Sequence, residues 1–143
     1  MREIKRSALV PHPPDRMFAL INDVERYPEF VPWCTRAHVE ARSEREIVAT
    51  LAVRRGPLRA EFTTRNELEP DRMIRLHLVR GPFSVLEGQW ILTRIGTTGC
   101  RIELRMRFGF ATTFSGALFE PVFEKMAASL LDAFVARAKA VYG

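Results

Sequence analysis

The middle of the chain alternates between apolar and polar residues with a period of two. Five or six such segments follow one another from about residue 35 to residue 110, separated by turns rich in glycine or proline. In residues 100–108 the even positions are apolar and the odd positions are charged. One-sided strands of this kind predict an antiparallel sheet with one dry face and one wet face.

The pattern before this region predicts three shorter elements. Residues 2–10 alternate well enough to form a first strand, which the proline-rich segment 11–14 ends because proline donates no hydrogen bond to a ladder. Apolar residues at helical spacing predict a short helix over 15–21. A second short helical turn around 24–30 is interrupted by Pro28.

After residue 110 the period changes to 3.6 and predicts one long helix that runs nearly to the C-terminus. Its apolar stripe consists of Leu118, Phe119, Val122, Phe123, Met126, Leu130, Phe134, Ala138 and Val141. The helix either begins at Pro121 or is kinked there. Only this helix is long enough to cover the dry face. The order therefore predicts an α+β fold, in which a strongly curved antiparallel sheet of about seven strands wraps around the terminal helix.

Length and composition fit one globular domain over residues 1–143, with 47% hydrophobic and 27% charged residues. No apolar run approaches the ~20 residues of a membrane span, and the charged N-terminus does not resemble a secretory signal. Cys34 and Cys100 fit neither a metal site nor a disulfide framework. We therefore expect a cytoplasmic protein that holds no metal or cofactor.

A straight helix cannot touch a curved sheet everywhere, so the gap is either filled by side chains or left as a pocket. Ala60, Thr64 and Gly88 are small residues at the predicted centre of the dry face, with large apolar residues around them. The candidate ligand-binding residues are Phe18, Trp33, Phe62, Asn66, Leu76, Leu78, Trp90, Phe108, Phe110, Phe123, Met126 and Leu130. An isoprenoid tail or acyl chain suits such a lining. The same pattern is typical of a filled core, so both interpretations stay open.

Two polar residues lie close to this apolar set. Asn66 is predicted to point inward, where it either binds a ligand head group or satisfies loop backbone near the strand end. Arg80 lies either at the mouth of the cavity or in a turn.

The sequence offers no set of catalytic side chains. The histidines His12, His38 and His77 have no cysteine or carboxylate at metal or triad spacing, and we expect each of them on the solvated surface. Carboxylates such as Glu61, Glu67 and Glu103 fall on the wet face beside arginines, as cross-strand ion pairs would. Because no general acid–base pair can be assembled on the dry face, we predict that the protein is not an enzyme.

The net charge of +5 comes mostly from arginine and favours an anionic partner such as RNA or an acidic membrane surface, although a compositional preference for arginine would give the same charge. The arginines predicted on the wet face are Arg59, Arg65, Arg75, Arg101, Arg105 and Arg107. They form either a phosphate-reading surface or a solvated face with ion pairs. We do not expect DNA as a partner.

Several motifs, taken together and in order, resemble the family of ribosome-association toxins (RatA) and coenzyme Q-binding proteins. They are residues 6–11, 22–24, 27–30, 32–34, 62–66, 81–83, 88–90, 100–103 and 134–142. The resemblance covers essentially the whole chain. It implies a START-like, helix-grip fold of the polyketide cyclase and lipid transport superfamily, which agrees with the predicted order of elements.

The resemblance also implies two functions that the alternation alone does not show. The first is non-enzymatic binding of an isoprenoid quinone or lipid in the cavity, in support of ubiquinone function in respiration. The alternative is attachment to the large ribosomal subunit, which blocks subunit joining and inhibits translation. Some relatives are cyclases or aromatases, a third alternative that the missing acid–base residues argue against.

Overall fold

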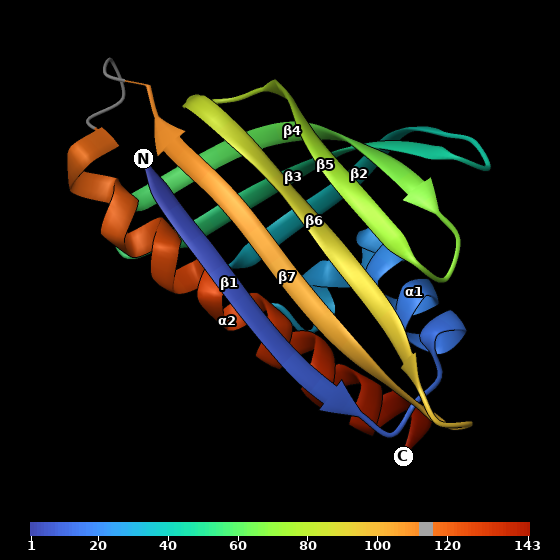
Figure 1. Cartoon of the computed structure of the whole chain (residues 1–143). Helices are drawn as coiled ribbons and strands as arrows, with labels where there is room; N and C mark the ends of the chain where they lie inside the picture. The colour runs from blue at the N-terminus through green and yellow to red at the C-terminus, as the bar shows by residue number, and fades with distance from the viewer. Residues whose placement is uncertain (112–115) are drawn as a thin grey trace.

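The computed structural model describes residues 1–111 and 116–143 (Figure 1). The elements are β1 (Arg2–Val10), α1 (Pro14–Asn22), the 3-10 helix η1 (Val24–Glu29), β2 (Cys34–Arg42), β3 (Glu46–Arg55), β4 (Leu58–Glu69), β5 (Met73–Arg80), β6 (Phe83–Ile95), β7 (Gly99–Phe110) and α2 (Gly116–Tyr142). This order is the predicted one, and the α+β class is confirmed.

The seven strands form one antiparallel sheet in the order β1-β7-β6-β5-β4-β3-β2. Strands β2 to β6 each pair with the next strand along the chain, and β1 pairs with β7 at the far edge. Figure 1 shows β1, β7 and β6 crossing the direction of β4, β3 and β2, with α2 running along the inner side of the bend. The predicted curved sheet around a terminal helix is therefore confirmed.

The register separates an inner, apolar face from an outer, polar one. In β7 the even positions from Cys100 to Phe110 are all buried, and the odd positions up to Arg107 are exposed or half-buried. Trp90 pairs with Leu104 on one side and with Ile74 on the other, and all three are buried. The alternation predicted for the middle strands therefore describes the real faces of the sheet.

An aromatic cluster joins α2 to the inner face. The ring of Phe123 lies 4.8 Å from that of Phe108, 5.1 Å from Phe83, 5.7 Å from Phe110 and 6.1 Å from Phe62, measured between centroids. These pairs meet edge to face, a favourable geometry for aromatic rings. One helical residue therefore contacts aromatic side chains from three different strands.

The helix α2 begins at Gly116, so Pro121 lies inside it and does not start it. Two predicted members of the apolar stripe are wrong, because Leu118 is 70% exposed and Val141 is 52% exposed. Leu118 precedes Phe123 by five residues, a rotation of about 140° around the helix that turns it away from the sheet. Val141 lies in the last turn. Among the described helices, none is long and apolar enough to cross a membrane.

We predict that Phe123→Ala lowers the free energy of unfolding by about 3–5 kcal/mol, because the cavity lies among four aromatic rings. Urea denaturation followed by circular dichroism measures this change. Leu118→Ala is the matched control on the same helix and should stay within about 0.5 kcal/mol of the unmodified protein. Equal effects of the two substitutions would show that the cluster does not hold α2 in place.

Candidate functional site

The predicted ligand-binding residues all lie in the interior of the fold, and all but two are buried. The two exceptions are Leu76 and Leu78 on β5, which are half-buried. Burial places the side chains where the alternation predicted, and their role in holding a ligand stays a prediction.

The inner face keeps some accessible surface at β3, β4 and β5. Leu51, Ala60, Thr64, Leu76 and Leu78 are only half-buried although their register turns them inward. Thr64 pairs directly with Leu78 across β4 and β5. These five residues form the half-buried part of the inner face.

The polar groups of the interior are bound to protein atoms. The Asn66 side chain is buried, and its Oδ1 accepts a hydrogen bond from the Thr64 hydroxyl at 2.8 Å. Trp33 Nε1 donates to Ser129 Oγ at 3.1 Å, which ties the start of β2 to α2. Sequence reasoning missed Ser129 because nothing in a helical pattern shows which strand or loop faces a given turn.

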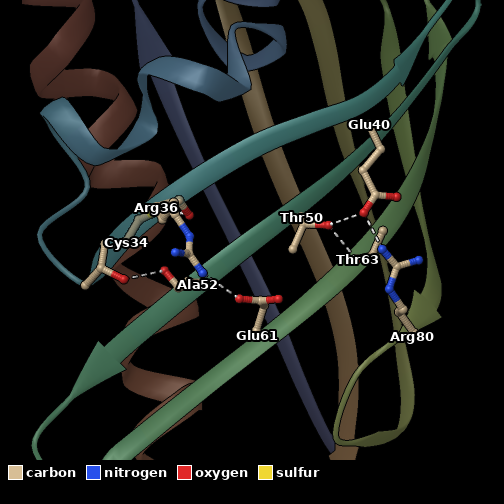
Figure 2. A network of polar contacts seen from close by, with 9 residues as sticks. Cys34, Arg36, Glu40, Thr50, Ala52, Glu61, Thr63 and Arg80 are labelled. Carbon is tan, nitrogen blue, oxygen red and sulfur yellow. Dashed lines mark hydrogen bonds and ion pairs between the residues drawn. The ribbon is translucent and has the colours of Figure 1, made fainter.

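Arg80 lies on the outer face, so its predicted place at the mouth of an inner cavity is wrong. Its guanidinium pairs with the carboxylate of Glu40, as Figure 2 shows. Arg80 faces outward because the pairing of β4 with β5 is irregular: Thr64 pairs with Leu78, but Thr63 pairs with Arg80. The extra residue, Val79, shifts the even-numbered Arg80 to the outer side.

A network of polar contacts continues from Glu40 across the outer face (Figure 2). Thr50 Oγ1 lies 3.0 Å from Glu40 Oε1 and 2.6 Å from Thr63 Oγ1. Thr63 is only 1% exposed although it points outward, because this network covers it. Beside it, a hollow of about 430 Å³ is lined by side chains that include Arg36, His38, Glu40, Glu61 and Arg80.

A larger outer-face groove of about 650 Å³ crosses β1, β7, β6 and β5. Its polar lining residues are Glu3, Lys5, Arg75, His77, Glu87, Gln89, Arg105 and Arg107. Ile4, Leu76, Gly88 and Met106 form the floor, since the register turns these residues inward. The groove therefore lies between two rows of outward side chains, on the opposite side of the sheet from the buried aromatic cluster.

Four of the six arginines predicted on the wet face are ion-paired, as one of the two alternatives for them expects. Arg65 lies 3.1 Å from Glu46 and 3.4 Å from Glu67, and Arg75 lies 2.8 Å from Glu69. The remaining pairs join Arg105 to Glu103 and Arg107 to Glu3 and Glu87. Within residues 1–111 and 116–143, neither Arg59 nor Arg101 has an acidic partner.

Of the three histidines expected on the solvated surface, His38 is exposed and His12 is buried. His12 is only 6% exposed, because its ring packs against Tyr142 with 5.5 Å between the centroids. No pattern of residues indicates this contact, which joins positions 12 and 142 near opposite ends of the chain. On β5, His77 Nε2 lies 2.6 Å from Glu67 Oε1. That carboxylate partner comes from the neighbouring strand, ten residues away in sequence.

The two thiols and one phenol of the interior are held in their neutral forms. Burial raises the pKa of the Cys34 and Cys100 thiols to about 11, so both are protonated at neutral pH and are poor nucleophiles. Burial also raises the pKa of Tyr27 well above its usual value, and its hydroxyl donates to the Ile21 carbonyl. In the described part of the chain, no three metal-ligating side chains gather into a possible ion site.

Comparison with known proteins shows the family. The sequence profile of the polyketide cyclase / dehydrase and lipid transport family matches residues 10–135. The chain belongs to this family. It is 44% identical over 140 residues to the ribosome association toxin RatA of Pseudomonas aeruginosa, covering 98% of this chain and 97% of that one. The mitochondrial coenzyme Q-binding protein coq10 of Schizosaccharomyces pombe is 26% identical over 143 residues, covering 94% and 85% of the two chains.

Solved structures of low sequence identity share the fold. A START superfamily protein of Mycobacterium smegmatis superposes with a TM-score of 0.77 at 17% identity, covering 97% of this chain and 98% of that one. The Zhui aromatase/cyclase of a Streptomyces species superposes with a TM-score of 0.83 at 18% identity, covering 96% and 93%. The predicted START-like fold is therefore confirmed, and at these identities the likeness concerns the fold alone.

We predict that Thr63→Val lowers the free energy of unfolding by about 1 kcal/mol, because a buried hydroxyl pair is lost while the side-chain shape is kept. The measurement is the midpoint of urea denaturation. Thr93→Val, at an exposed position of β6, is the control and should leave the midpoint unchanged. A stabilised Thr63 variant would contradict the role given to the network of Figure 2.

Proposed function

We propose that this protein associates with the large ribosomal subunit and inhibits translation, without catalysing a reaction. The observation that carries the proposal is the likeness to RatA of Pseudomonas aeruginosa, which extends over nearly all of both chains at 44% identity. A relative from Vibrio cholerae, also a ribosome association toxin RatA, is 40% identical over 143 residues. This likeness is much stronger than the one to the coenzyme Q-binding protein.

The charge of the chain supports an RNA-containing partner. A net charge of +5 attracts a polyanion, and counterion release then adds to the binding free energy. The ion pairs of the outer face neutralise many of the arginines, so the attraction depends mainly on those that have no carboxylate beside them.

The interior supports a non-enzymatic role. Its polar side chains Thr64 and Asn66 hydrogen-bond to each other, and its thiols are protonated. His77, the histidine with a carboxylate partner, lies on the outer face with that carboxylate. We therefore assign no general base to the inner face.

We predict that the purified protein sediments with large ribosomal subunits and not with small ones. Because phosphate contacts release counterions, the affinity should fall by about tenfold or more between 50 and 200 mM salt. Addition of the protein should also reduce the joining of the two subunits in a reconstituted reaction. The proposal would be contradicted if cosedimentation did not depend on the salt concentration, or if the protein bound both subunits equally.

A second function, binding of a hydrophobic ligand on the inner face, is favoured by a separate observation. The inward residues of β3, β4 and β5 named above are only half-buried, and the apolar ones among them pack against the core. The family includes lipid transport proteins, and one relative is a coenzyme Q-binding protein. We propose that an isoprenoid quinone or lipid tail contacts this surface, independently of the ribosome.

We predict that ubiquinone-2 quenches the tryptophan fluorescence of the protein in a saturable manner. Leu78→Glu should weaken this binding by about tenfold or more, because it places a charge beside the apolar tail. Val79→Glu is the matched control, since Val79 is the exposed neighbour on the same strand, and its binding should be unchanged. Equal losses in both variants, or no quenching at all, would remove this second function.

A further inference from the structure

The hairpin between β3 and β4 ends in three exposed arginines, which we call the arginine tip: Arg54, Arg55 and Arg59. In the part of the chain that the structure describes, no carboxylate lies within ion-pair distance of any of them. In this respect the tip differs from Arg65, farther along β4, which contacts two carboxylates.

The tip places like charges directly opposite each other. Arg54 pairs with Arg59 across the two strands, an arrangement that destabilises a sheet. The next outward pair along the hairpin is Ala52 with Glu61, and Glu61 is already bound to Arg36 at 3.0 Å. The nearest acid is therefore engaged, and Arg36 adds another guanidinium beside the tip. The sheet gains no stability from this arrangement, whereas a bound polyanion would relieve the repulsion.

The backbone below the tip is held firmly. Val53 is 2% exposed and Leu58 is fully buried, so both strands of the hairpin are anchored in the core next to the arginines. The Arg54 amide donates to the Trp33 carbonyl at 2.9 Å, which fixes the hairpin to the segment before β2. Gly56 has a φ of 58°, a conformation that favours glycine, and Pro57 restricts the rest of the two-residue turn. Binding therefore requires little ordering of the chain.

We propose that the arginine tip is the surface that binds phosphate groups of ribosomal RNA. This inference rests on the proposed ribosomal function and names the contact that serves it. Guanidinium groups match the geometry of phosphate and form two parallel hydrogen bonds to it. The paired arginines of the outer face contribute less, because each must first leave its carboxylate.

The test compares two triple variants with the same change of charge. Arg54→Gln, Arg55→Gln and Arg59→Gln together remove the tip, and Arg65→Gln, Arg75→Gln and Arg105→Gln together remove paired arginines. Cosedimentation with large subunits over a series of salt concentrations gives the slope of log affinity against log salt. Loss of the tip should lower the magnitude of that slope by about 2–3, since each phosphate contact contributes about 0.7–0.9. The control variant, which lacks the three paired arginines, should lower the magnitude of the slope by less than about 1.

A single variant separates binding from folding. Arg59→Glu places a carboxylate opposite Arg54, so the melting temperature should stay the same or rise while the affinity for the large subunit falls. If the two triple variants lose the same amount of binding to large subunits, the attraction follows net charge alone, and the proposed phosphate binding by the arginine tip is wrong. The proposed ribosomal function would not be affected by that result. An unmodified protein that never binds large subunits would overturn both.

Discussion

The contact between α2 and the concave side of the sheet is the constraint on which the other features depend. Through Phe123 the helix touches rings from β4, β6 and β7 at once, so the curvature of the sheet and the position of the helix are set together. Once the inner face is closed in this way, every second side chain of the regular strands points to the outer face. The dense ion pairing of the outer face follows, because long charged side chains of both signs lie side by side, most of them on neighbouring strands.

The two proposed functions use opposite faces of one sheet. Val53 and Leu58 are buried next to Arg54 and Arg59, which are exposed on the same two strands. A partner on the outer side therefore meets guanidinium groups, and a ligand on the inner side meets leucine, alanine and threonine.

Local patterning carried the prediction of the elements and their faces, because the side-chain period differs between strands and helices. It failed where a single extra residue changed the parity, as at Val79, which moves Arg80 to the outer face. It also failed for contacts between distant segments, such as His12 on Tyr142. Local patterning also did not predict the arginine tip, because only the register of β3 and β4 shows that Arg54 lies opposite Arg59. Likewise, alternation identified inward residues without showing which of them stay accessible.

The pairing of the first strand with the last has a kinetic consequence. Residues Arg2 to Val10 align with Phe108 back to Cys100, so this ladder joins segments about a hundred positions apart. Such high contact order slows folding, and during synthesis β1 must wait, unpaired, until nearly all of the chain has left the exit tunnel. The β3–β4 hairpin, whose partners are close in sequence, can form much earlier. A nascent chain of this protein would thus display its arginine-bearing hairpin beside the translating ribosome before the sheet is complete.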